Sequence, residues 1–143
     1  MVNAATPKTL EFTLPTELAA QQIVHERVVT QIRNAGCTSR DEFSIRLALE
    51  EALANAMKHG NQMQPEKKVF VKSTVSGSTV TIEVIDEGEG FSPATIPDPT
   101  SDENVGRATG RGMLLITSFM DEVIYNKKGN GVVMTRLLGA VPG

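Results

Sequence analysis

Five short stretches of the chain alternate apolar with polar side chains or are rich in Val, Ile and Thr, as half-buried β-strands are. They are residues 8–14, 67–75, 78–85, 123–126 and 132–138. Only Ser76 and Gly77 separate the second stretch from the third, which predicts a tight antiparallel hairpin. The last two stretches are predicted to form another hairpin around residues 127–131.

Three other stretches carry apolar side chains at helical spacing, at residues 16–34, 39–59 and 112–121. Thr16 is the expected N-cap of the first helix, and Ser39 with Glu42 forms a capping-box pattern at the start of the second. Gly36 and Gly60 stand where C-terminal caps are expected. The order of these elements predicts an α+β two-layer sandwich, with a mixed, mostly antiparallel sheet and helices on one face.

The composition excludes several classes of protein. With 143 residues, 40% of them hydrophobic, the chain is expected to fold as a single domain over residues 1–143. It has no apolar run of about 20 residues and no secretory signal, and its single cysteine, Cys37, fits a reducing compartment, so we expect a cytoplasmic protein with no membrane span. A net charge of −3 and the absence of Trp argue against nucleic-acid binding. An enzyme, a small-ligand binder and a protein-interaction module all remain.

A polar strip runs along the second predicted helix, because Glu51, Asn55 and His59 are spaced at i, i+4 and i+8. The neighbouring Ala52 and Ala56 are small enough for a ligand to approach closely. A carboxamide oxygen can ligate Mg²⁺, and a carboxylate one turn away can act as a general base. The same spacing also suits the solvated edge of an amphipathic helix.

A carboxylate follows the third predicted strand directly: Asp86 ends the strand, and Gly88 and Gly90 come two and four residues later. Such a carboxylate can accept a hydrogen bond from an exocyclic amino group, and the glycines allow the backbone to approach a flat ring. Alone the pattern is weak evidence, since it is also typical of an Asx turn.

Residues 106–113 are rich in glycine and lead directly into the last predicted helix. Backbone N–H groups at a helix N-terminus can bind an anion, and Arg107, Thr109 and Arg111 add donors for phosphate. A flexible hinge is the alternative interpretation. The whole of residues 86–112 lacks a predicted element, a length typical of a functional lid. Neither a Walker A loop nor a Rossmann fingerprint is present.

Together, the order and spacing of these three patterns resemble those of the GHKL ATPases. Among them, the chain is most similar to the small anti-sigma factor serine/threonine kinases of the general-stress and sporulation type. Residues 50–60 resemble the N-box of that family, residues 86–91 its first glycine box and residues 109–113 its second, and residues 119–123 are also typical of these kinases. The resemblance extends over nearly the whole chain and implies the Bergerat, or histidine kinase-like ATPase, fold.

The resemblance implies a role for each candidate residue. Glu51 would be the catalytic general base that takes the proton of the substrate hydroxyl, and Asn55 would hold the Mg²⁺ that bridges the phosphates of ATP. Asp86 would accept a hydrogen bond from the adenine amino group. The other ATP-binding positions would be His59, Gly60, Gly88, Gly90, Arg107, Thr109, Gly110, Arg111, Gly112 and Met113. Some of these kinases carry an arginine where this chain has Ala108, so the arginine that contacts phosphate stays unassigned.

The resemblance also implies a function. It predicts an ATP- and Mg²⁺-dependent protein serine/threonine kinase that phosphorylates an anti-sigma-factor antagonist with a STAS domain. It further predicts an anti-sigma factor that sequesters a sigma factor, acts through protein and not nucleic acid, and forms a homodimer. A nucleotide-dependent binding switch of the same fold, with no phosphate transfer, is the alternative. The ATP-binding part of a histidine kinase fits less well, because the chain has no phosphoacceptor helical hairpin.

Overall fold

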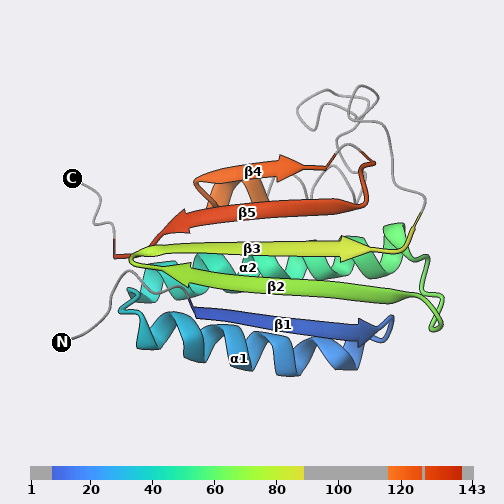
Figure 1. The fold of residues 1–143 in the computed structure, drawn as a ribbon, viewed down its shortest axis with the longest axis horizontal. Coiled ribbons are helices and arrows are strands. Elements are labelled where there is room, and N and C mark those ends of the chain that lie inside the picture. Colours follow the sequence, from blue (N-terminus) through green and yellow to red (C-terminus); the bar gives the residue numbers. More distant parts are fainter. Residues whose placement is uncertain (1–7, 89–115, 127, 140–143) are drawn as a thin grey trace.

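The structure is a computed structural model that describes residues 8–88, 116–126 and 128–139. Five strands form one sheet in the order β1-β2-β3-β5-β4 (Figure 1). Their bounds are Lys8–Pro15 for β1, Lys68–Ser76 for β2, Thr79–Asp86 for β3, Glu122–Tyr125 for β4 and Gly131–Leu137 for β5. Every pairing between these described strands is antiparallel, so the parallel pair that a mixed sheet would contain is not found among them.

Two long helices, α1 (Gln21–Asn34) and α2 (Ser39–Asn55), lie between β1 and β2 in the sequence. A short 3-10 turn, η1 (Leu18–Ala20), precedes α1, and a five-residue π-helical turn, η2 (Ala56–Gly60), continues α2. A further helical turn at residues 116–119 precedes β4. Of the helix predicted at residues 112–121, the structure thus describes a helical turn at residues 116–119, and residues 112–115 lie outside the described residues.

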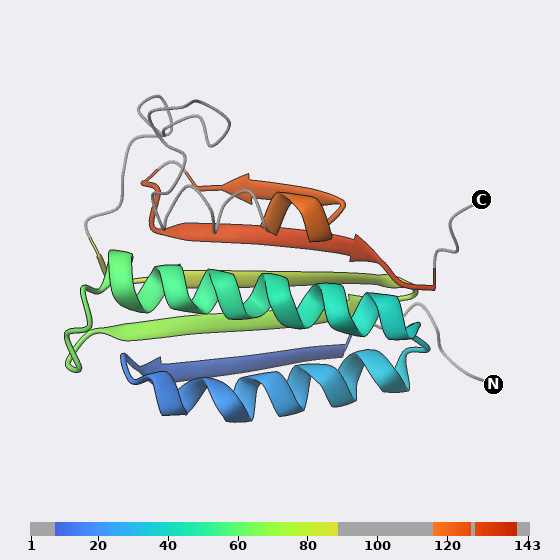
Figure 2. The ribbon, with the colours of Figure 1, turned by 180° about the vertical axis from the view of Figure 1, so that it is seen from behind.

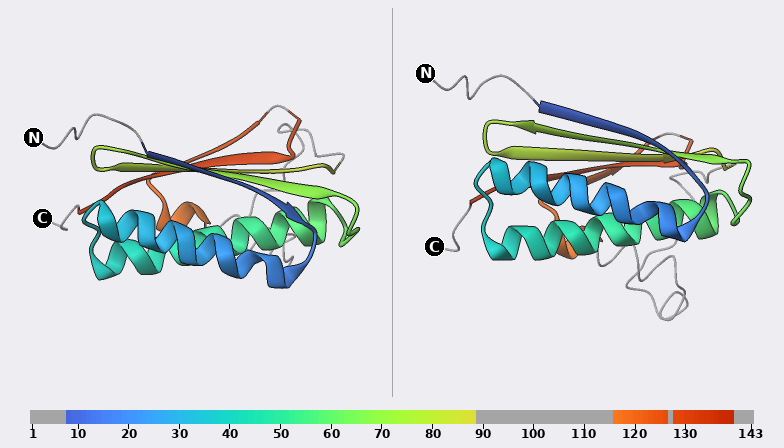
Figure 3. Two further views of the ribbon diagram at one scale, coloured as in Figure 1. Left: turned by 60° about the horizontal axis from the view of Figure 1, so that its bottom comes forward. Right: turned by 90° about the horizontal axis from the view of Figure 1, so that it is seen from below.

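The helices form a layer on one face of the sheet. α1 and α2 lie side by side, and the turn at residues 116–119 lies on the same side (Figures 2 and 3). Burial alternates along β2 and β3, so one side of each strand meets the helices. The side chains at the centre of this contact include Val28, Ile32, Ile45, Leu53, Met57, Val69, Ile82 and Met134. This arrangement confirms the predicted two-layer sandwich.

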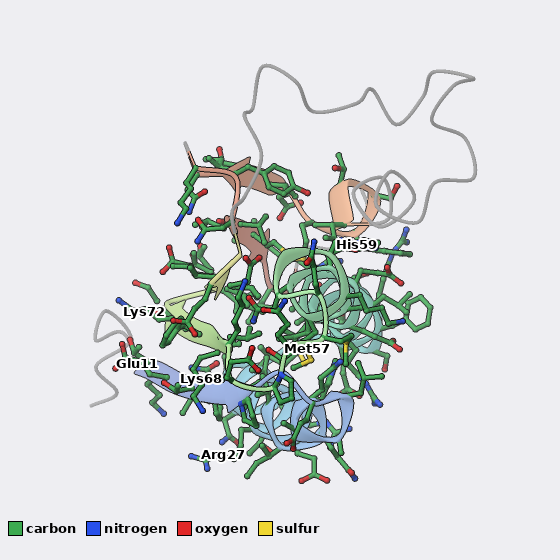
Figure 4. All side chains as sticks on the ribbon, turned by 90° about the vertical axis from the view of Figure 1, so that its right-hand side faces the viewer. Glu11, Arg27, Met57, His59, Lys68 and Lys72 are labelled. Carbon is green, nitrogen blue, oxygen red and sulfur yellow. The ribbon has the colours of Figure 1, made fainter. Side chains whose placement is uncertain are left out.

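The opposite face of the sheet carries polar side chains. Glu11, Lys72 and Glu83 occupy paired positions on β1, β2 and β3, and Figure 4 shows Glu11 and Lys72 on the side away from the helices. Opposite charges on neighbouring strands stabilise an exposed face modestly. Within the described ranges, no helix combines the length and the hydropathy that a membrane span requires.

The start of α2 differs from the prediction by one residue. Thr38, and not Ser39, is the N-cap: its hydroxyl accepts from the Asp41 N–H at 3.0 Å, and the Asp41 carboxylate accepts from the Thr38 N–H at 2.9 Å. The pattern T-x-x-D therefore performs the reciprocal capping that was expected of Ser39 and Glu42. The Glu42 side chain is not available for capping, because it pairs with Arg33, whereas the buried Asp41 faces Thr38.

Asp41 also joins α2 to the last strand. One carboxylate oxygen accepts from the Arg136 Nε at 3.0 Å, and the other accepts from the Gly139 N–H at 2.7 Å. Arg136 in turn donates to the Phe119 carbonyl at 2.7 Å. Burial alone would raise the pKa of Asp41, but the hydrogen bonds from Gly139, Thr38 and Arg136 outweigh it and lower the pKa. Asp41 thus stabilises the fold as an anion.

We expect Asp41→Asn to lower the free energy of unfolding by about 3 kcal/mol at pH 7, because breaking a buried ion pair leaves the remaining charge without a partner. Urea denaturation measures this. Since the pKa of Asp41 is lowered, the difference from the wild type should shrink as the pH falls below 3.8, the usual value. Arg33→Ala, which removes an exposed pair with Glu42, is the control and should barely move the midpoint. An equal loss in both variants would contradict the assignment.

Candidate functional site

A cavity of about 460 Å³ opens between the end of the α2 helix, the end of β3 and the turn between β4 and β5. The helical wall is formed by Ala52, Asn55, Ala56, His59 and Gly60. β3 contributes Val84 and Asp86. The remaining described walls come from the segment between η2 and β2, from Ile116, and from Tyr125 of β4, Val132 of β5 and the turn between these strands.

The predicted polar strip reaches this cavity in part. Asn55 and His59 line it, with Ala52 and Ala56 keeping the wall low, as their helical spacing predicts. Asn55 is half-buried, and no described residue forms a hydrogen bond with its carboxamide. Glu51, one turn earlier, is half-buried but is not among the lining residues. The structure therefore brings Asn55 and His59 together with Asp86 and leaves Glu51 just outside.

The last turn of this helix is wider than an α-helix. The Asn61 N–H donates to the Ala56 carbonyl at 2.8 Å, an i to i+5 bond of the π type. Met57 is fully buried, and Figure 4 shows it between the helices and the sheet, whereas His59 on the same turn is exposed. The prediction of a regular helix up to His59 is wrong here, because Asn61 takes over the capping that Gly60 was expected to provide.

Asn61 was not predicted, yet it connects four parts of the fold and is fully buried. Its Nδ2 donates to the Thr16 hydroxyl at 2.9 Å and to the Lys68 carbonyl at 3.0 Å, and its Oδ1 accepts from the Glu87 N–H at 2.8 Å. Thr16 does not cap α1 as expected: its hydroxyl donates to the Lys67 carbonyl at 2.6 Å. The only sequence signal is an Asn directly after a helix-ending glycine.

Two predicted glycines, Gly60 and Gly88, pack directly against Asp86. A Cβ on Gly60 would lie 2.2 Å from the Asp86 Oδ2, and a Cβ on Gly88 would lie 2.1 Å from the Gly60 carbonyl oxygen. Real Cβ contacts are never this short, so a larger residue at either position must displace its neighbours. Only glycine allows the end of the helix, the end of β3 and the following turn to meet around one carboxylate.

Asp86 is 8% exposed. Its Oδ1 accepts from the Gly88 N–H at 2.8 Å, and no described residue forms a hydrogen bond with Oδ2. Burial raises the pKa of Asp86, although the Gly88 N–H and the charges of Lys128 and Lys67 oppose the rise. A largely buried carboxylate whose pKa is raised and which lines a cavity is a feature typical of a ligand site.

The hairpin predicted around residues 127–131 is confirmed by the antiparallel pairing of β4 and β5, but its turn also lies at the site, which was not predicted. Gly129, Asn130 and Gly131 form part of the cavity wall. The Asp86 N–H donates to the Asn130 carbonyl at 2.8 Å, so the turn contacts the carboxylate residue directly. Glycine and asparagine are common in any turn, and this composition therefore gave no signal that the turn lies at the site.

The remaining predicted positions, Gly90, Arg107, Thr109, Gly110, Arg111, Gly112 and Met113, lie outside the described residues. Ile116, the first described residue after them, lines the cavity. The second glycine box therefore stands, in the sequence, a few residues before a cavity-lining position.

The model of the family described as the histidine kinase-like ATPase domain matches residues 14–136. This range includes the cavity and all the candidate residues. The chain belongs to the histidine kinase-like ATPase family. The predicted resemblance to this family is confirmed.

The sequence of this histidine kinase-like ATPase is similar to those of an anti-sigma factor and of a serine-protein kinase. It is 36% identical over 112 residues to an anti-sigma F factor of Thermoanaerobacter pseudethanolicus, with 72% of this chain and 75% of that one covered. It is 28% identical over 117 residues to the serine-protein kinase RsbW of Listeria monocytogenes, with 73% and 74% covered.

A crystal structure of the RsbU and RsbW domains of a Mycobacterium tuberculosis protein matches the fold with a TM-score of 0.63 at 19% identity. The match covers 94% of this chain and 34% of that one, so the histidine kinase-like ATPase spans about a third of the longer protein. At this identity the match supports the fold alone.

The described residues fit a nucleotide and a magnesium ion. Asp86 lines a cavity of about 460 Å³, and among the described residues its Oδ2 has no hydrogen-bond donor. No three His, Cys, Asp or Glu side chains gather in the described part of the chain, so a cation would rely on few protein ligands. Mg²⁺ suits such a site, since it usually keeps several waters and binds one or two side chains plus substrate phosphates.

We expect Asp86→Asn to stabilise the ligand-free histidine kinase-like ATPase at pH 7. The raised pKa of Asp86 means that ionisation is harder in the folded state, so the charge costs stability above pH 3.8, the usual value. The advantage of the variant should therefore grow as the pH rises from 3.8 and level off once the folded Asp86 is ionised. Thermal unfolding from pH 4 to pH 8 measures it. A variant less stable than the wild type throughout would contradict this sign.

Proposed function

We propose that this chain is an ATP-dependent protein serine/threonine kinase and anti-sigma factor, which phosphorylates an antagonist with a STAS domain and sequesters a sigma factor. One observation carries the proposal: Asn55 from α2 and Asp86 from β3 face the same cavity of nucleotide size. The names of the relatives, anti-sigma F factor and serine-protein kinase RsbW, support the activity and the partner classes.

Asp86 is proposed to select adenine. Its Oδ2 accepts a hydrogen bond from the exocyclic amino group, while the Gly88 N–H holds Oδ1 in place. Gly60 and Gly88 pack so closely against Asp86 and each other that a Cβ is excluded, which fixes the carboxylate at the cavity wall. Gly88 and Gly90 are proposed, from the sequence, to shape the adenine pocket. The apolar side chains of Val84 and Ile116 complete this end of the cavity.

Asn55 is proposed to hold Mg²⁺ through its carboxamide oxygen, at the helical wall of the cavity. The ion supplies charge neutralisation for the phosphates of ATP when bound. His59 and Gly60 follow at the end of the same helix. From the sequence, Arg107, Thr109, Gly110, Arg111, Gly112 and Met113 are proposed to contact the phosphates, although the arginine that does so is not assigned.

Glu51 is proposed to be the general base. It stands one helical turn before Asn55, outside the cavity wall that the described residues form. From there it accepts the proton that the serine or threonine hydroxyl of the antagonist gives up as its oxygen becomes the phosphate ester and ADP leaves.

Asp86→Asn should weaken ATP binding by about 1–3 kcal/mol, or roughly 5- to 150-fold in Kd, because the variant loses a charged hydrogen bond to the adenine amino group. Isothermal calorimetry with ATP and Mg²⁺ measures the change. Asp121→Asn changes an exposed carboxylate outside the cavity in the same way and is the control. ATP affinity that is equal in the two variants would remove Asp86 from the adenine site.

Glu51→Gln should leave the Kd for ATP within about twofold and slow phosphate transfer by roughly 100-fold or more, the usual contribution of a general base. The measurement is transfer from labelled ATP to a STAS-domain antagonist from the source organism. Glu50→Gln, the same change on the exposed neighbour, should transfer at the wild-type rate.

An unchanged rate of phosphate transfer in Glu51→Gln would contradict the role of Glu51 as general base. If the wild type binds ATP but transfers no phosphate to any antagonist, the kinase proposal fails. The nucleotide-dependent binding switch would then be the better description of the protein.

A further inference from the structure

The strand that carries Asp86 ends in an unusual pairing with the β4–β5 turn. The register between β3 and β5 ends at Ile85 and Gly131. One position further, the Asp86 N–H donates to the Asn130 carbonyl at 2.8 Å, as an antiparallel ladder would continue. The reciprocal bond comes from a side chain instead: the Asn130 Nδ2 donates to the Asp86 carbonyl at 2.7 Å.

The side chain is needed because the backbone of Asn130 is already engaged. Its N–H donates to the Asn126 Oδ1 at 3.1 Å, and the Gly129 N–H donates to the same oxygen at 2.7 Å. The backbone N–H of Asn130 therefore does not reach the Asp86 carbonyl. Without the Asn130 carboxamide, that carbonyl would lose its donor at the point where β3 leaves the ladder.

The Asn130 carboxamide is itself fixed by Asn126. Because two backbone N–H groups converge on one side-chain atom of Asn126, that atom is the oxygen, and the nitrogen lies opposite. This nitrogen donates to the Asn130 Oδ1 at 2.9 Å, which leaves the Asn130 nitrogen facing Asp86. Gly131 allows the approach, since a Cβ there would lie 2.7 Å from the Asn126 Nδ2.

We propose that Asn130 is the positioning residue of Asp86: it holds the backbone of Asp86 from both sides and so sets where the carboxylate meets the base of a bound nucleotide. The part of this inference that concerns adenine rests on the proposed function. The two hydrogen bonds between Asn130 and the backbone of Asp86 do not depend on it. The sequence separation explains why no local pattern showed this link: the donor lies 44 residues after its acceptor.

If Asn130 positions Asp86, it should affect which base the protein prefers more than how tightly it binds nucleotides in general. A hydrogen bond between Asp86 and an amino group depends on the direction of the carboxylate, whereas contacts to the phosphates do not. A shift of the Asp86 backbone should therefore weaken ATP more than ITP, whose base carries an oxygen in place of the amino group. A merely structural residue would weaken both nucleotides equally.

The test compares Asn130→Ala and the isosteric Asn130→Asp with Asn34→Ala, an exposed control at the end of α1. The Kd values for ATP and ITP are measured by calorimetry. We expect the ratio of the ITP value to the ATP value to fall roughly fivefold in both Asn130 variants, as for one lost hydrogen bond. Asn34→Ala should keep the wild-type ratio.

A second measurement needs no nucleotide. Hydrogen exchange of the Asp86 and Gly88 amides should be faster in both Asn130 variants than in the wild type and the control, because the end of β3 is released. Asn130→Asp keeps the size of the side chain, so it also serves if Asn130→Ala fails to fold.

Unchanged exchange at these amides would overturn the hold on Asp86, whatever the protein binds. Faster exchange with an unchanged ratio of Kd values would make Asn130 structural only and would overturn its role in selecting the base. If the wild type binds neither nucleotide, the proposed function fails, and the exchange measurement alone decides whether Asn130 holds Asp86.

Discussion

The packing of two glycines around Asp86 is the contact on which the rest of the site depends. The helical turn η2, the end of β3 and the turn after it can meet only because Gly60 and Gly88 have no side chains. This contact buries the carboxylate, and burial raises its pKa. The protein therefore carries a group that costs stability in the ligand-free state and that a donor from a ligand would satisfy. Such a cost is typical of groups that serve binding.

The neighbouring asparagines keep this costly arrangement in one geometry. Asn61 fastens η2 to the starts and ends of the surrounding strands, and Asn130 fastens the backbone of Asp86. Each uses both ends of its carboxamide, so neither side chain can turn without losing bonds. The backbone N–H and carbonyl of Asp86 are both bonded to Asn130, so a fixed backbone carries the carboxylate.

The sequence predicted the fold well where local signals were strong. The hairpin of β2 and β3 agrees within a residue or two, because alternation and a Gly-containing turn define it locally. Asn55, His59 and Asp86 were correctly expected to be close together, through spacing and the resemblance to the family. The predictions failed where long-range contacts decide. Thr16 and Asn61 bond across the fold, and Asn130 bonds to a residue far back in the chain. No window of local sequence contains both partners of these bonds.

The two buried carboxylates show how the fold separates stability from binding. Asp41, at the start of α2, accepts from Thr38, Arg136 and Gly139, and its pKa is lowered. Asp86 packs against Gly60, at the other end of that helix. Among the described residues, only the Gly88 N–H donates to its carboxylate, and its pKa is raised. The same residue type, largely buried in both places, thus has its ionised form favoured at one end of the helix and disfavoured at the other. Burial raises the pKa of both carboxyl groups, but only Asp41 has an arginine and several N–H donors among the described residues to outweigh it. The carboxylate that lines the cavity is the one whose charge the described residues stabilise less.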